Sequence, residues 1–208
     1  MLNTEKNNRL TRLYEQTMKE IGDFFKINWT RNRPKVFLVP DRKTIDSLRE
    51  TKTPRWLVGW AGAKSEGIYI LDSRNFEKES ENSYSIEKWE ALLKHELIHC
   101  FYGIATDMQR KPVWLCEGAS TYLSGQNKWK KPIKIFEKIL DSYDMHDKSA
   151  YYEGGFAVQF LIEKYGKDKL LELLNKIKKE KPNKQDFAKL FQSVYGFKLS
   201  YTNLNKLL

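Results

Sequence analysis

The spacing of apolar and polar residues divides the chain into a mixed first half and a helical second half. Apolar side chains recur at close to helical period over residues 4–26, which predicts an amphipathic helix. Runs rich in β-branched and aromatic residues predict three short strands, at 36–39, 56–60 and 67–71. Asp41 is predicted to cap a short helix that ends near Glu50, and the polar residues 73–84 are predicted to form a surface loop.

From residue 85 onward, only helical periodicity is evident. Ser83 or Ser85 can cap a helix that runs to Tyr102 and is closed by Gly103. Further helices are predicted over 112–124, 133–140, 149–165, 167–179 and 183–195. Pro112 suits a first helical position. Glycines stand where three of these helices should stop: Gly125, Gly166 and Gly196.

These elements predict an α+β fold in a single domain that covers all 208 residues. A small mixed α/β lobe, residues 1–103, holds a short sheet and ends in a helix. An all-helical lobe, residues 104–208, follows it. A chain of this length can bury one sizeable core. We expect a cleft between the two lobes, with the helix after residue 85 as its floor.

That helix carries the segment His95-Glu96-Leu97-Ile98-His99, an HExxH motif. Two histidines at positions i and i+4 project from one helix face, where both can bind one ion. Glu96 follows the first histidine and is expected to reach the attacking water. Neighbouring leucines already supply an apolar surface, so this polar set is costly to bury without a partner. Zinc suits these ligands, and we expect one Zn²⁺ per chain.

The residues downstream of the motif carry a family resemblance. A metzincin would need glycine and histidine where this chain has Tyr102 and Ala105, so that class is excluded. The segment Trp114 to Tyr122 reads Trp-Leu-x-Glu-Gly-x-x-x-Tyr and resembles the gluzincins, the thermolysin and aminopeptidase-N type of zinc peptidase. The resemblance implies that Glu117, on the next helix, is the third metal ligand. Its helix neighbour Cys116 points about 100° away and would replace it only if the helix were turned.

A second segment also resembles this superfamily. Tyr152-Glu153-Gly154-Gly155 matches the Tyr-Glu-x-Gly pattern of the aminopeptidase-N type, and the resemblance extends over roughly residues 56–175. It implies that Tyr152 donates a hydrogen bond to the tetrahedral oxyanion, with Tyr151 as the competing candidate. The following residues also resemble small bacterial peptidases described as peptidase MA-like. The expected function is therefore a zinc-dependent peptidase, a hydrolase with Glu96 as general base.

A short spacing and two positions limit the resemblance. Only 17 residues separate His99 from Glu117, which implies a shortened connecting loop. Thr121 stands where thermolysin-like enzymes often carry an aspartate that orients the first histidine, so another group must do this here. His146 could assist the oxyanion, but its polar surroundings favour a solvated loop histidine.

The resemblance also implies how substrate binds. Gluzincins bind peptide as an added strand along a sheet edge, and Gly67, Ile68 and Tyr69 lie in the strand predicted to form that edge. The run from Gly62 to Glu66 is only distantly similar to the exopeptidase loop that binds a free α-amine. We interpret it as a turn and expect an endopeptidase acting on peptide or protein substrates.

Composition limits the partners and the location. The formal net charge is +10, which attracts anionic surfaces or polymers, or simply gives a well-solvated face. There is no specific nucleic-acid motif. No apolar run approaches the roughly 20 residues that span a bilayer, and the polar start is unlike a signal peptide. We expect a cytoplasmic protein, or a secreted or surface one if a leader was removed. The two cysteines, Cys100 and Cys116, are expected to be buried and reduced.

Two other functions remain open on the sequence. A protein with this fold could bind an anionic partner through its basic surface without catalysis, although the intact Glu96 argues against this. A zinc hydrolase acting on a non-peptide amide would need the same residues, and nothing in the sequence separates it from a peptidase.

Overall fold

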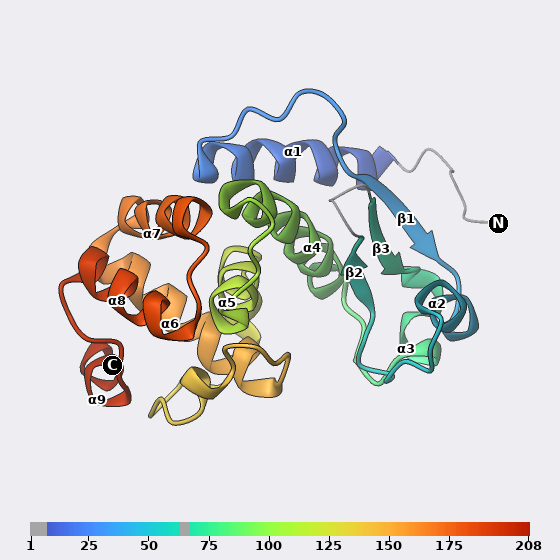
Figure 1. Cartoon of the computed structure of the whole chain (residues 1–208). Helices are drawn as coiled ribbons and strands as arrows, with labels where there is room; N and C mark the ends of the chain where they lie inside the picture. Colours follow the sequence, from blue (N-terminus) through green and yellow to red (C-terminus); the bar gives the residue numbers. More distant parts are fainter. Residues whose placement is uncertain (1–7, 63–66) are drawn as a thin grey trace. The chain divides into compact units, whose positions relative to one another are not determined.

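The computed structural model describes residues 8–62 and 67–208, drawn in colour in Figure 1. Helices and one small sheet make up the described chain, so the predicted α+β class is confirmed at this coarse level. The chain divides into two compact units, Met1–Cys100 and Phe101–Leu208. Among the described residues, no helix is both long and apolar enough to cross a membrane.

The first unit contains one long helix, α1 (Asn8–Phe25), and a three-stranded sheet. The strands and the short helix between them are β1 (Lys35–Val39), α2 (Arg42–Arg49), β2 (Gly59–Ala61) and β3 (Gly67–Leu71). The predicted helix start at residue 4 lies outside the described residues. Asp41 caps α2 as predicted, because its carboxylate accepts a hydrogen bond from the Thr44 amide at 2.7 Å.

The sheet has the order β1-β3-β2, with β1 parallel and β2 antiparallel to β3. Lys35 pairs with Gly67 at one end of the parallel register, and Gly59 pairs with Ile70 in the antiparallel one. The central strand is the most buried, with Ile68 and Ile70 fully inaccessible. The prediction that residues 67–71 form a sheet edge is therefore wrong, because β3 has a hydrogen-bonded strand on each side.

Two local predictions in this unit are also wrong. The second strand begins at Gly59 rather than at residue 56, because the Arg42 guanidinium holds the preceding stretch as a loop through the carbonyls of Pro54 and Leu57. The predicted loop over 73–84 starts with a 3₁₀ turn and a short helix, α3 (Phe76–Glu79). Asp72 begins that turn by accepting from the Arg74 amide at 2.9 Å.

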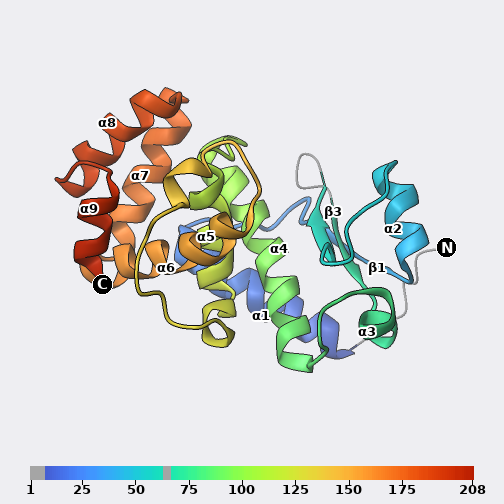
Figure 2. The same cartoon turned by 90° about the horizontal axis from the view of Figure 1, so that it is seen from below.

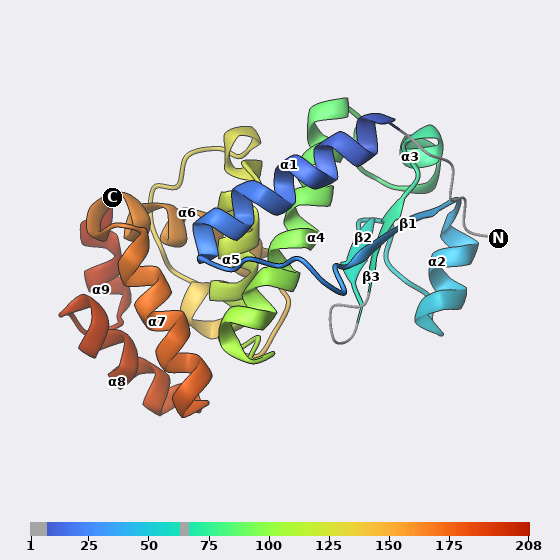
Figure 3. The ribbon, with the colours of Figure 1, turned by 90° about the horizontal axis from the view of Figure 1, so that it is seen from above.

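The helix with the histidine motif is α4 (Ile86–Thr106). Ser85 begins it as predicted, with its hydroxyl accepting from the Lys88 amide at 3.2 Å. The helix runs past Gly103, contrary to the prediction, and ends where Asp107 and Met108 adopt positive φ angles of 53° and 62°. Within the first unit, α1 crosses α4 at an angle (Figures 1 and 3), and Lys94 forms an ion pair with Glu20 of α1 at 3.2 Å.

The second unit is helical. Its helices are α5 (Val113–Leu123), α6 (Lys148–Tyr165), α7 (Lys167–Glu180), α8 (Lys184–Tyr195) and α9 (Tyr201–Leu204). The predicted glycine stops are confirmed, because Gly125, Gly166 and Gly196 all have φ near +80°. Pro112 is the residue before α5 rather than its first residue.

Helices α5 and α6 pack backbone against backbone (Figure 2). A Cβ atom built on Gly118 would lie 2.4 Å from the carbonyl oxygen of Gly154, and one built on Gly154 would lie 2.6 Å from that of Trp114. Only glycine fits at either position without displacing a helix. This contact fixes the segment around Glu117, one residue before Gly118, against α6.

The predicted helix over 133–140 is wrong. This stretch is irregular and ends in a 3₁₀ turn, Ile139–Asp141. The Glu153 carboxylate accepts hydrogen bonds from the amides of Glu137, Lys138 and Ile139, at 3.1, 3.1 and 2.9 Å. A side chain on α6 thus satisfies amides that a helix would have used. The apolar side chains of Phe136 and Ile139 are still buried, which explains the misleading helical pattern.

Candidate metal centre

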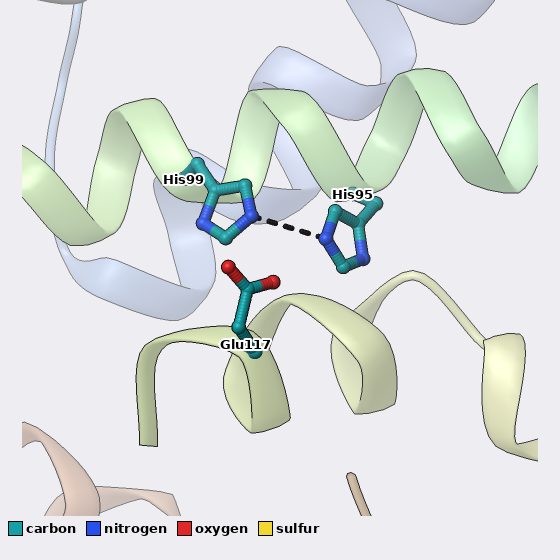
Figure 4. A group of neighbouring side chains, drawn as sticks. All are labelled: His95, His99 and Glu117. Atoms are coloured by element: carbon teal, nitrogen blue, oxygen red, sulfur yellow. Dashed lines mark hydrogen bonds between the residues drawn. The ribbon is translucent and has the colours of Figure 1, made fainter. Parts of the chain in front are cut away.

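Three side chains from two helices form a compact cluster (Figure 4). α4 supplies His95 and His99, and α5 supplies Glu117. One ligand atom from each residue lies within 4.8 Å of the other two. The two imidazole Nε2 atoms are 3.0 Å apart, and each residue is at most 7% exposed.

The helix geometry explains the cluster. His95 and His99 are one turn apart on α4, so their rings project from the same face. Residues 113–121 of α5 are buried throughout, and Glu117 is the charged side chain among them. Burying a carboxylate beside two imidazoles is costly unless a cation compensates them. Two ring nitrogens and one carboxylate oxygen match the ligand set of an open zinc site, so the donors fit this metal.

The cysteines do not take part in this group. Cys100 and Cys116 are buried and form no disulfide bond within the described chain. The cluster found among the described residues contains Glu117 rather than its neighbour Cys116. The structure therefore brings together the three residues that the sequence predicted as ligands, and the group does not include the alternative thiol.

Glu96 is buried beside the sheet, with 5% of its surface exposed. A Cβ atom built on Gly59, the first residue of β2, would lie 3.2 Å from Glu96 Oε1 and 3.1 Å from Leu92 Cδ1. The carboxylate thus lies directly against the backbone of β2. A larger residue than glycine at position 59 would have to displace it.

His146 lies in an exposed loop, as predicted, but it also contacts Glu117, the predicted third ligand, which was not predicted. Its Nδ1 atom is 3.0 Å from Glu117 Oε1. The hydrogen bond to Glu117 raises the pKa of the imidazole, although burial and the charge of Arg110 oppose this. Its side chain is 56% exposed, whereas that of Glu117 is 5% exposed. The local sequence gave no signal for this contact, because it joins residues 29 positions apart.

Tyr152 lies near the start of α6, and its hydroxyl donates to the backbone carbonyl of Lys131 at 3.0 Å. Its ring packs edge-on against Phe156. A role at an oxyanion stays a prediction, and it requires this hydroxyl to leave Lys131. The competing Tyr151 accepts a hydrogen bond at its carbonyl from Lys130, at 2.6 Å. Burial lowers the pKa of the Lys130 ammonium to about 8.

The remaining sequence-derived site residues lie elsewhere. Gly67, Ile68 and Tyr69 are in the central strand β3, where Tyr69 stacks between Phe37 and Trp60 at 4.9 Å ring separation on each side. The turn predicted between Gly62 and Glu66 falls mainly on residues 63–66, which lie outside the described residues. Thr121 is fully buried, and its hydroxyl has no hydrogen-bond partner in the described parts of the chain.

Comparisons with known proteins add little to this picture. No family model matches the chain. The chain is 24% identical over 152 residues to "Uncharacterized protein YhcO" of Bacillus subtilis (strain 168), in an alignment that covers 66% of this chain. The chain spans 46% of the length of that protein. No solved structure matches.

Proposed function

We propose that this chain is a zinc metallopeptidase of the gluzincin type. The observation that carries the proposal is the buried cluster of His95, His99 and Glu117, with Glu96 directly after the first histidine. The spacing of the two histidines and the glutamate on the following helix are those of the gluzincin pattern. The proposed catalytic fold is accordingly a gluzincin fold with a short sheet and a helical part that carries the third ligand.

Each side chain has a defined task in this proposal. The two imidazoles and the Glu117 carboxylate would hold zinc, which when bound acidifies water and polarises a carbonyl group. Glu96 accepts a proton from the attacking water and passes it to the departing amine. Tyr152 donates its hydroxyl proton in a hydrogen bond to the developing oxyanion, after leaving the Lys131 carbonyl.

The sheet order suggests where a peptide would bind. Since β3 is central, β1 and β2 each have one side without a neighbouring strand among residues 8–62 and 67–208. β2 is the strand that lies against Glu96, through Gly59. A peptide added as a further strand along β2 would therefore lie beside the general base, and its backbone hydrogen bonds would be independent of its sequence. We propose this edge, in place of Gly67–Tyr69, as the binding strand of an endopeptidase.

The Glu96→Gln variant tests the catalytic part of the proposal. Glutamine keeps the size of the side chain but cannot take the water's proton. The variant should hold as much zinc as the wild type and lose nearly all hydrolysis of a mixed peptide library, read by mass spectrometry. Wild type and variant that are equally inactive, with zinc bound to both, would instead support a metal-bound protein without peptidase activity.

A further inference from the structure

His146 is the one histidine outside the motif, and it contacts the third ligand of the proposed site. The contact is a hydrogen bond between His146 Nδ1 and Glu117 Oε1, at 3.0 Å. An ionised carboxylate can only accept hydrogen bonds, so the Nδ1 atom must carry the proton and donate it. The imidazole therefore fixes one oxygen of the carboxylate in space.

The loop that carries His146 is attached to the beginning of α5. The amides of Val113 and Trp114, the first two residues of α5, donate to the carbonyls of Tyr143 and Ser142 at 2.9 and 3.1 Å. These amides belong to the first turn of the helix, where no partner exists within the helix itself. The loop thus moves with the helix that carries Glu117.

The same loop is also attached to α6 through Asp147. Its Oδ1 atom accepts hydrogen bonds from the hydroxyls of Ser142 and Ser149, at 2.7 and 2.5 Å, and from the Ala150 amide at 2.9 Å. Asp147 is the N-cap of α6 and the direct neighbour of His146. Both ends of the segment 142–147 are therefore held, and His146 is presented to Glu117 from a fixed backbone.

We propose that His146 is a positioning residue for the metal centre, which orients the Glu117 carboxylate so that it can serve as the third ligand. This inference rests on the proposed function. Partners of this kind, which hold a ligand without touching the ion, typically change metal affinity by about 10- to 100-fold when they are removed. Because half of the imidazole is exposed, its loss should leave the fold intact.

Zinc affinity, measured by competition with a chromogenic chelator, tests the inference without any need for substrate. We expect His146→Ala to bind zinc about 10- to 100-fold more weakly than the wild type. His146→Asn, whose amide can place a donor near the position of Nδ1, should recover most of that loss. The matched control is Met145→Ala, because this neighbouring side chain is 57% exposed and should leave affinity unchanged.

The visible absorption of the cobalt-substituted proteins provides a second readout. It should change in His146→Ala, because the carboxylate reorients, and return towards the wild-type spectrum in His146→Asn. Equal zinc affinity in the wild type and His146→Ala would overturn the inference and leave the zinc site standing. An equal loss in Met145→Ala would also overturn it, since the effect would then belong to the loop as a whole. A wild-type chain that binds no zinc would overturn the proposed function itself.

Discussion

A methyl group added at Gly118 should destabilise the chain by forcing α5 away from α6. The new Cβ atom of Gly118→Ala would lie 2.4 Å from the Gly154 carbonyl oxygen. This distance is 1.0 Å shorter than 3.4 Å, the shortest ordinary van der Waals contact. The carbonyl oxygen is a backbone atom and the backbone fixes the position of the Cβ atom, so no side-chain rotation can relieve the overlap. One of the two helices has to move.

Two opposing effects set the magnitude. Alanine favours a helix over glycine by about 1 kcal/mol, which alone would stabilise the variant. Overpacking of this kind costs about 1–3 kcal/mol, and a backbone overlap belongs at the upper end. We therefore expect the free energy of unfolding to fall by about 2 kcal/mol. Zinc affinity should fall as well, since Glu117 is the residue before Gly118.

Urea unfolding followed by far-UV circular dichroism measures this change, with a chelator present so that metal binding does not contribute. Gly125→Ala is the matched control, because nothing lies within 4 Å of its new Cβ atom and only its φ of +79° is unfavourable. That control should lose about 1 kcal/mol. A Gly118→Ala chain as stable as the wild type, or more stable, would refute the close contact of α5 with α6.

Two further predictions concern the proposed active site, and a third concerns the stability of the fold. Gly59→Ala should keep zinc but lower peptide hydrolysis about tenfold in a cleavage assay. Its new Cβ atom would lie only 3.2 Å from Glu96 Oε1 and would push the carboxylate away. Unchanged hydrolysis would show that β2 is not part of the site. Tyr152→Phe should lower kcat by about 10²–10³-fold with zinc content unchanged, and Tyr151→Phe should lower kcat only slightly. A large loss of kcat in Tyr151→Phe and a small one in Tyr152→Phe would show that the motif is misaligned. Burial opposes ionisation of Asp147, but the hydrogen bonds that it accepts outweigh this and lower its pKa. Its ionised form therefore stabilises the fold at neutral pH. The difference in unfolding free energy between wild type and Asp147→Asn, measured by urea unfolding at a series of pH values, should disappear as the pH falls below about 4. A difference that grows in acid would contradict this.

The sequence predicted the parts of the site that local helix geometry or a local sequence pattern indicates. The i, i+4 spacing places His95 and His99 on one face of any helix, whatever surrounds it. Glu117 was found because its sequence neighbours resemble a known pattern. The contact of His146 with Glu117 was not predicted, because it depends on a loop held by backbone hydrogen bonds to α5, which no local pattern encodes.

The errors in the fold have the same origin. The strand at 67–71 was predicted correctly, but its central place in the sheet depends on pairing with two distant strands. The stretch 133–140 has a helical pattern of apolar residues, yet Glu153, on α6, binds its amides and prevents the helix. In both cases a contact that is distant in sequence determined the outcome.

The number of zinc ions per chain tests the central claim most directly. It is measured on the purified wild type and on three variants, His95→Ala, His99→Ala and Glu117→Ala. We predict about one zinc in the wild type and loss of the metal in each variant, because an open site with three protein ligands needs all of them. Zinc retained at wild-type level by Glu117→Ala would contradict the account and direct attention to Cys116.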